Sequence, residues 1–211
     1  MDALSMSAAD HDSWPHTRAY LEMLPDGLSS HPTTLVKASA LLAFRSRLEL
    51  GGLDEMPADL ADVVRYPPLP SQWLPTVHMN VVEMMLVDQL GSVAAFEELA
   101  YQINCNYLRS PLYRVAFRVL SPQMLLRGAA FRWRHFHRGS SLKVMRMDSR
   151  SARLHLTYPN HLFNAAIASE KGGAFRVALE LAGAREIEMS CEQPTSTDAF
   201  YESTWSTSSA S

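Results

Sequence analysis

The sequence has few cysteines, no long apolar run and no strong excess of either charge. Only two of its 211 residues are cysteine, too few for a disulfide-stabilised secreted domain. The formal net charge of −3 favours neither a polyanion-binding surface nor an acidic tail. No apolar stretch approaches the about 20 residues of a membrane span, and the first residues lack the basic start and apolar core of a signal peptide. We therefore expect a reduced, cytoplasmic protein without membrane insertion.

Motifs of the common catalytic sites are also missing. The glycines near Gly139 and in Lys171-Gly172-Gly173 lack the spacing of a phosphate-binding loop. No Gly-x-Ser-x-Gly elbow is present. Cys105 lies between two asparagines, without a neighbouring base, which is typical of a buried thiol. The sequence predicts no catalytic residues and no enzymatic activity.

Hydrophobic residues make up 47% of the chain and charged residues 19%, enough apolar material for one globular core. We expect a mobile segment over residues 1–14, a single domain over residues 15–205 and a disordered tail over residues 206–211.

Apolar spacing and capping residues predict six helices before residue 140. Gly91-Ser92 ends one helix and caps the next, and Ser110-Pro111 and Ser121-Pro122 are typical N-cap and N1 pairs. The predicted ranges are 35–50, 56–64, 76–90, 93–108, 111–120 and 122–133.

The remaining residues predict a β-β-α-β-β unit. Alternating apolar and polar residues indicate strands over 141–147, 152–158, 185–191 and 200–205, with a helix over 160–182. Gly172-Gly173 weakens that helix, and the sequence leaves its continuity open. The predicted fold class is α+β, with an N-terminal helical layer packed on a four-stranded antiparallel sheet.

Basic residues are concentrated between residues 127 and 153, among aromatic side chains, a composition found in nucleic-acid-binding proteins. Acidic residues are concentrated between residues 186 and 202. If these strands adjoin, opposite charges pair across them. We therefore expect internal pairing, or an acidic protein partner at Arg132, Arg134 and Arg138, and no nucleic-acid binding.

Aromatic and methionine side chains between residues 73 and 133 suit an adaptable apolar pocket. The candidate pocket residues are Trp73, Met84, Met85, Phe117 and Phe131. Apolar residues at helical spacing also describe a solid core, and the sequence alone does not separate the two.

His135 and His137 are two residues apart, which would place both on one face of a strand. The surrounding arginines would repel a divalent cation, so the sequence predicts no metal site.

Four stretches carry a resemblance to known proteins: Val36-Lys37-Ala38-Ser39; Leu69–Pro75 (LPSQWLP); Ser121–Arg127 with Arg132-Trp133-Arg134; and Leu181-Ala182-Gly183-Ala184. In this order the chain resembles bacterial proteins, many of them myxobacterial, that are related to the haem-NO-binding and vinyl-reductase-like small-molecule-binding folds. The resemblance covers about residues 35–205. It implies a helical cap over a four-stranded sheet, with an apolar pocket between the layers.

Two departures bear on cofactors. Vinyl-reductase-like domains often carry paired cysteines near the final hairpin, whereas Cys191 has no second cysteine between Gln193 and Tyr201. Haem-binding relatives carry a Tyr-x-Ser-x-Arg motif, whose nearest counterpart, beginning at Tyr158, lacks the serine and the arginine. His78, on a predicted helix, remains a candidate iron ligand. The resemblance with these departures predicts no cofactor, neither haem nor zinc.

The sequence and the resemblance together predict a non-enzymatic sensory or regulatory module that binds a small apolar ligand between helices and sheet. The alternative is a protein-interaction or scaffold module with a filled core, acting on a protein partner or as a homodimer.

Overall fold

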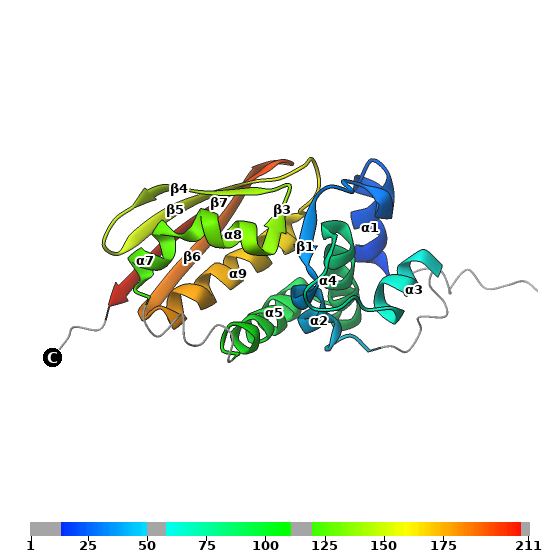
Figure 1. Cartoon of the computed structure of the whole chain (residues 1–211), viewed down its shortest axis with the longest axis horizontal. Coiled ribbons are helices and arrows are strands. Elements are labelled where there is room, and N and C mark those ends of the chain that lie inside the picture. The colour runs from blue at the N-terminus through cyan, green and yellow to red at the C-terminus, as the bar shows by residue number, and fades with distance from the viewer. Residues whose placement is uncertain (1–13, 50–57, 111–119, 208–211) are drawn as a thin grey trace, which may run out of the picture.

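The structure is a computed structural model that describes residues 14–49, 58–110 and 120–207. It has two parts lying side by side (Figure 1): a helical part built mainly from the first half of the chain, and a four-stranded sheet with its covering helices. The predicted α+β class, with a helical layer and an antiparallel sheet, is confirmed. No helix within the described ranges is long and apolar enough to cross a membrane.

The helical part contains α1 (Pro15–Met23), the short 3-10 helix η1 (Gly27–Ser29), α2 (Ala38–Arg45), α3 (Ala58–Arg65), α4 (Thr76–Leu90) and α5 (Val93–Leu108). Helices α4 and α5 have the ranges expected from the sequence, because Gly91 adopts a left-handed conformation with φ of 64°. The Ser92 side chain then accepts a hydrogen bond from the backbone N–H of Ala95, which caps α5.

Three very short strands form a sheet that the sequence did not predict. Its order is β2-β1-β3, with β1 at Leu35–Lys37, β2 at Trp73–Pro75 and β3 at His137–Arg138. The expected helix over 35–50 is therefore wrong at both ends, since β1 precedes α2 and the helix stops at Arg45. Strands of two or three residues are too short to show an alternating pattern, and their partners lie far away in the chain.

The larger sheet has the order β4-β5-β7-β6, all antiparallel. Its strands are β4 (Ser141–Met147), β5 (Ser151–Thr157), β6 (Ala184–Thr195) and β7 (Asp198–Thr207). The last hairpin is longer than predicted on both sides, and β7 continues to Thr207, inside the tail that was expected to be disordered. Ser206 and Thr207 pair with Arg185 and Ala184, beyond an irregularity between Arg185 and Glu188. Their polar side chains do not prevent pairing, because the ladder is formed by backbone groups.

Helices α7 (Pro122–Arg127), α8 (Ala129–Phe136) and α9 (Ala165–Leu181) cover one face of this sheet (Figure 1). The predicted helix over 122–133 is divided at Gly128, the residue that ends α7 and precedes α8. The predicted helix over 160–182 begins only at Ala165, because the Asn164 side chain caps its first turn. The predicted helix over 111–120 lies almost wholly outside the described residues, as do most of the segment 1–14 and residues 208–211.

Helix α9 is continuous through Gly172-Gly173. A Cβ atom at Gly172 would lie 3.3 Å from the ring of Tyr201, a tight contact. The glycine therefore lets α9 lie close against β7, and this packing offsets the helix propensity that glycine lacks.

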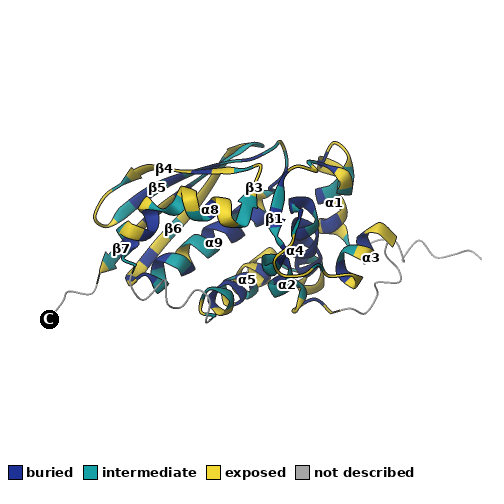
Figure 2. Ribbon diagram, viewed as in Figure 1, coloured by how far each residue is buried: buried dark blue, intermediate teal, exposed yellow. Residues whose placement is uncertain are grey.

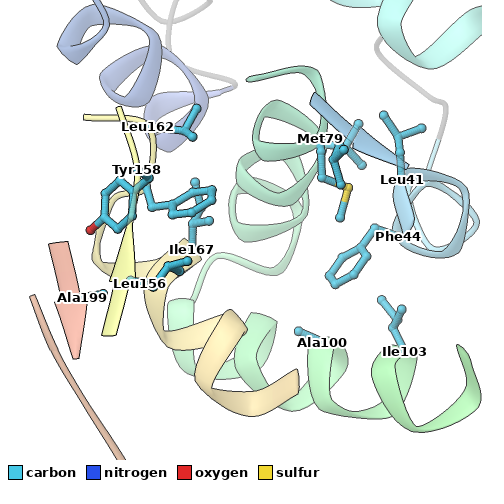
Figure 3. Packing of buried hydrophobic residues seen from close by; sticks show 14 of the residues in the cluster. Leu41, Phe44, Met79, Ala100, Ile103, Leu156, Tyr158, Leu162, Ile167 and Ala199 are labelled. Carbon is cyan, nitrogen blue, oxygen red and sulfur yellow. The ribbon is translucent and has the colours of Figure 1, made fainter. Parts of the chain in front are cut away.

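Buried side chains extend through both parts of the molecule (Figure 2). Figure 3 shows two regions of this core: Phe44, Met79 and Ile103 lie among α2, α4 and α5, and Leu156 and Ile167 lie between the sheet and α9. Helix α4 is buried on nearly every side, as expected for a helix that is apolar all round. The core thus connects the two parts, and the site described next lies between them.

Candidate functional site

A cavity of about 210 Å³ lies where the helical part meets the covered face of the sheet. Phe44 of α2, Met79 of α4 and Ile103 of α5 line one side, and Leu142 of β4 and Leu154 of β5 line the other. Apolar side chains of α7, α8 and α9 complete most of the wall: Leu125, Leu126, Ala129, Phe136, Ala174, Phe175, Ala178 and Leu179. An interior wall of this kind favours an apolar guest.

Polar groups of the lining have atoms that are not hydrogen-bonded within the described residues. These atoms are Thr76 Oγ1, Asn80 Oδ1 and His137 Nδ1. The Asn80 Nδ2 group is used elsewhere, because it donates to Tyr20 Oη at 2.8 Å and to the Leu162 carbonyl at 2.7 Å. Buried polar atoms are nearly always paired with protein or water. These three atoms are enclosed by the lining, so a ligand would reach them only if side chains of the lining moved.

A buried ion cluster, formed by Glu83, Glu170 and Lys171 with Asn104, borders the cavity. Lys171 Nζ lies 2.9 Å from Glu83 Oε1 and 2.5 Å from Glu170 Oε2. Asn104 Nδ2 donates to Glu170 Oε1 at 2.8 Å. Glu83 comes from α4, Asn104 from α5 and the other two from α9, and each is at most 8% exposed. The cluster therefore joins the helical part to the helix that covers the sheet.

Two carboxylates share one ammonium group in this cluster. Burial raises the pKa of Glu83 to about 7, although Lys171 opposes the shift and Glu170 adds to it. Burial lowers the pKa of Lys171, but the two neighbouring carboxylates outweigh it and hold that pKa above its usual value. Lys171 thus stays charged, and a proton is readily taken up at Glu83.

His137, the first residue of β3, presents a neutral imidazole to the cavity. Its ring stacks on Trp133, with centroids 3.8 Å apart and planes inclined by 13°. Burial, with a smaller contribution from Lys171, lowers the pKa of His137 to about 3. A neutral imidazole with an unpartnered nitrogen is a good ligand for iron or zinc.

The structure places the sequence-predicted pocket residues elsewhere. Met84 and Met85 are buried in α4, and the Trp73 ring lies in β2, with Lys37 Nζ 4.4 Å and Arg138 Cζ 4.0 Å from its centroid. Phe131 is 61% exposed, and Phe117 lies outside the described residues. None of the four described residues lines the cavity, because α4 and α8 turn other faces toward it and helical spacing does not identify which face is inward.

The three arginines of the predicted partner surface do not form one patch. Arg132 lines the cavity, and its Nη1 donates to the Leu125 carbonyl at 2.8 Å. Arg138 lies over the Trp73 ring, and Arg134 is exposed. The three side chains lie at different places because Arg132 and Arg134 belong to α8, which ends at Phe136, whereas Arg138 belongs to β3, which begins at the next residue.

The pairing of basic and acidic strands is confirmed. Arg153 of β5 lies opposite Glu202 of β7 in the sheet register, and the two side chains approach to 3.4 Å. His135 and His137 do not share one strand, since His135 lies in α8 and His137 in β3. His135 Nδ1 lies 3.0 Å from the Phe131 carbonyl of its own helix. His78 lies on α4 near Asp59, away from the cavity.

Across the described ranges, no group of three His, Cys, Asp or Glu side chains is placed to hold a bare metal ion. This finding does not concern haem, whose iron takes most of its ligands from the porphyrin. In the sequence His137 stands out only as one of a histidine pair. Its spacing of four residues from Trp133 does not reveal the stacking, which the turn from α8 into β3 creates.

Comparisons with known proteins bear on the fold. Neither protein-family models nor curated proteins gave a match. Among solved structures, an H-NOX protein from S. oneidensis is similar with a TM-score of 0.56 and 9% identity, over 82% of this chain and 98% of that chain. The Fe(II) unliganded H-NOX protein from K. algicida has a TM-score of 0.54 and 9% identity, over 81% of this chain and 96% of that chain. A structure described as probing the function of haem distortion in the H-NOX family has a TM-score of 0.53 and 9% identity, over 80% of this chain and 94% of that chain.

These neighbours correct the expectation that no cofactor is involved. The expectation relied on a missing Tyr-x-Ser-x-Arg motif, whereas solved proteins of this fold are described by their haem and its iron. The chemistry of the lining suits such a group in two respects, through an apolar wall for the ring and through the neutral imidazole of His137 for the iron. A cavity of about 210 Å³ is smaller than a porphyrin, so haem binding would require the helical part and the sheet to move apart. The chain has the fold of H-NOX domains.

Proposed function

We propose that the chain is a sensory module that binds a small, largely apolar molecule in the cavity between its helical part and its sheet. The observation that carries the proposal is the cavity itself, about 210 Å³ in volume, with an apolar wall and unpartnered polar atoms. A few placed polar groups in an apolar wall are typical of ligand sites. No catalytic role is proposed for these residues.

The position of the cavity supplies a sensing mechanism. A bound molecule contacts α2, α4 and α5 on one side and α8, α9 and the sheet on the other. It therefore stabilises the arrangement of the two parts that fits it best. The Lys171–Glu83 ion pair connects α9 with α4 beside the same cavity, so a change in helix position would alter this contact too.

Haem is the ligand class that we propose first, and His137 is the specific observation that favours it. The imidazole lines the cavity, is neutral, and has an Nδ1 atom without a hydrogen-bond partner in the described part of the chain. Stacking on Trp133 fixes the ring orientation. When bound, the iron of haem supplies a coordination site for a small gas molecule.

The cavity is tested by filling it. Ala178 of α9 lines the cavity, so Ala178→Phe is expected to occupy it, whereas Ala95→Phe on the exposed face of α5 is the matched control. Apolar cavities of about 150 Å³ bind benzene, and a ligand at about ten times its Kd adds roughly 1.4 kcal/mol of stability. We expect benzene to raise the Tm of the wild type and of Ala95→Phe by a few degrees. An equal rise for a folded Ala178→Phe variant would contradict the proposal.

The haem assignment is tested with haemin and absorption spectroscopy. Wild-type protein is expected to bind haemin in a one-to-one ratio with the spectrum of imidazole-ligated iron. His137→Ala is expected to lose that spectrum and to regain it with added imidazole, whereas His135→Ala should resemble the wild type. Identical spectra for both variants would show that His137 does not hold the iron. If the wild type does not bind haemin, haem is overturned as the ligand class. The benzene experiment then decides separately whether the cavity binds an apolar ligand.

A further inference from the structure

The face of the four-stranded sheet that points away from α8 and α9, called here the outer face, has no helix of the described chain over it (Figure 1). Its side chains alternate with buried ones along the two central strands, β5 and β7. In one cross-strand row, Lys143 lies opposite His155, His155 opposite Phe200 and Phe200 opposite Glu192. A second row contains Arg146, Arg153, Glu202 and Ser190 in the same strand order. Both rows run from β4 to β6.

Charge is divided across these rows. The basic residues lie on β4 and β5, where an irregularity between Val144 and Arg146 brings Arg146 opposite Arg153. Within the chain Arg146 lies 3.7 Å from Asp148 and Arg153 lies 3.4 Å from Glu202. Like charges directly opposite are unfavourable in a sheet, so the basic half gains from a further acidic contact. The acidic residues Glu188, Glu192, Asp198 and Glu202 lie on β6 and β7, where Arg185 at the start of β6 is the basic exception. The outer face thus has a basic half on β4 and β5 and a mainly acidic half on β6 and β7.

Between the two halves lies an aromatic centre. The rings of His155 and Phe200 stack with centroids 4.4 Å apart and planes inclined by 4°. The Arg153 guanidinium lies 4.9 Å from the Phe200 centroid. Aromatic and arginine side chains at the middle of a surface are the groups that most often anchor protein interfaces.

We infer that the outer face binds a second copy of this chain, with a two-fold axis parallel to the strands. Rotation by 180° about such an axis brings the two outer faces together and exchanges β4 with β6 and β5 with β7. The basic half of each copy then faces the acidic half of the other, and the Phe200 rings meet near the axis. The face is therefore complementary to itself, which is the requirement for a closed two-fold dimer.

The dimensions of the sheet predict how strong this contact is. Four strands about 4.8 Å apart, each with about seven residues at about 3.3 Å, give a flat footprint of roughly 400 Å². Interfaces of that size are at the weak end of specific contacts, and exposed charge pairs are screened by salt. We expect dimerisation in the micromolar range that weakens as salt is raised.

Sedimentation velocity of the full chain at about 5 to 200 µM tests the inference, at low and at high salt. Wild-type protein is expected to dimerise with concentration at low salt and to be mostly monomeric at high salt. Lys143→Glu with Arg153→Glu reverses two of the three basic charges of β4 and β5, and Glu192→Lys with Glu202→Lys reverses two of the acidic charges of β6 and β7. Each variant alone is expected to remain a monomer, whereas an equimolar mixture should form a heterodimer.

The control is Glu97→Lys, an exposed charge reversal on α5, which should dimerise as the wild type does. Far-UV circular dichroism verifies that each variant is folded. A wild type that is monomeric at about 200 µM and low salt would overturn the inference. Variants that dimerise alone as well as the wild type would place the contact elsewhere, and would also overturn it.

Discussion

Replacing Lys171 with methionine is expected to lower the free energy of unfolding by about 3–5 kcal/mol at pH 8, because removing one partner of a buried ion pair leaves uncompensated charge. The lysine is the positive group within 3 Å of two buried carboxylates, at 2.9 Å from Glu83 and 2.5 Å from Glu170. Methionine keeps most of the apolar length of the side chain and removes the ammonium group, with its charge and its hydrogen bond to Glu83. Urea unfolding followed by circular dichroism measures the loss.

The stability lost in Lys171→Met should be smaller at low pH than at high pH. In the wild type the folded-state pKa of Glu83 is raised from 4.5 to about 7, so between these values the folded state binds more protons than the unfolded state. Stability from this group therefore falls as pH rises from about 4.5 to about 7. Without Lys171 the carboxylates lose the charge that opposes protonation, so the variant should recover part of its stability at pH 5.

Two further variants test whether the effect comes from the buried charge. Lys143→Met removes an exposed lysine of β4 and is expected to change stability by less than about 0.5 kcal/mol. Glu83→Gln added to Lys171→Met should restore part of the loss at pH 8, since one of the two carboxylates is then neutral. A loss that is equal at pH 5 and pH 8 would show that packing, and not charge, explains the effect of Lys171→Met.

Local signals in the sequence located the long elements of the fold. Gly91 and Ser92 separate α4 from α5 because one ends a helix with a left-handed backbone and the other caps the next helix with its side chain. Such signals act over three or four residues and are readable without knowing the partners. The alternating strands after residue 140 are equally local. The resemblance to the haem-NO-binding fold then supplied the layer arrangement, which the H-NOX neighbours show.

Tertiary contacts decided what local signals could not. Strand β1 pairs with β2, whose residues lie 36 to 40 positions further along the chain, and with β3, whose residues lie 101 to 103 positions further. Because these partners are not visible locally, the sequence suggested that the three residues of β1 start the helix that follows them. Gly172 has a low helix propensity, which suggested a break in the helix. In the structure the glycine leaves room for the ring of Tyr201 from β7, which would lie 3.3 Å from a Cβ atom. Only the folded chain brings these pairs together.

The structure has a cavity in the region where the sequence suggested a pocket, and the four described candidate residues do not line it. The sequence placed a pocket between helices and sheet, and the cavity lies there. The ion cluster beside the cavity, Glu83, Glu170 and Lys171, was not selected, because a single charged residue in a helix usually faces solvent. Their pairing depends on α4 and α9 being neighbours, and no sequence spacing encodes that contact.

Asp88→Ala is expected to lower the free energy of unfolding by about 2–3 kcal/mol, the range for hydrogen bonds to a buried charged group. The Asp88 carboxylate, in α4, takes the place of an N-cap for α1, since the N-cap residue Trp14 makes no side-chain cap bond. It accepts hydrogen bonds from the backbone N–H groups of His16 at 2.8 Å and Thr17 at 3.0 Å. Thr17 Oγ1 donates a further bond at 2.7 Å. The first N–H groups of a helix lack partners inside it, so Asp88 supplies them from a different helix.

The Asp88→Ala substitution should loosen α1 more than it loosens the rest of the protein. Tyr20 of α1 is fully buried and donates to the Leu162 carbonyl at 2.9 Å, so loss of the cap loosens a helix that contacts the loop before α9. Amide hydrogen exchange in residues 16–23 is expected to accelerate in Asp88→Ala, and the Tm to fall by roughly 2–4 °C for each kcal/mol lost. Asp88→Asn keeps one acceptor oxygen and should lose less, while Asp62→Ala on exposed α3 should leave both readouts unchanged. Unaltered exchange in α1 with a lower Tm would assign the role of Asp88 to packing within α4 instead of to the start of α1.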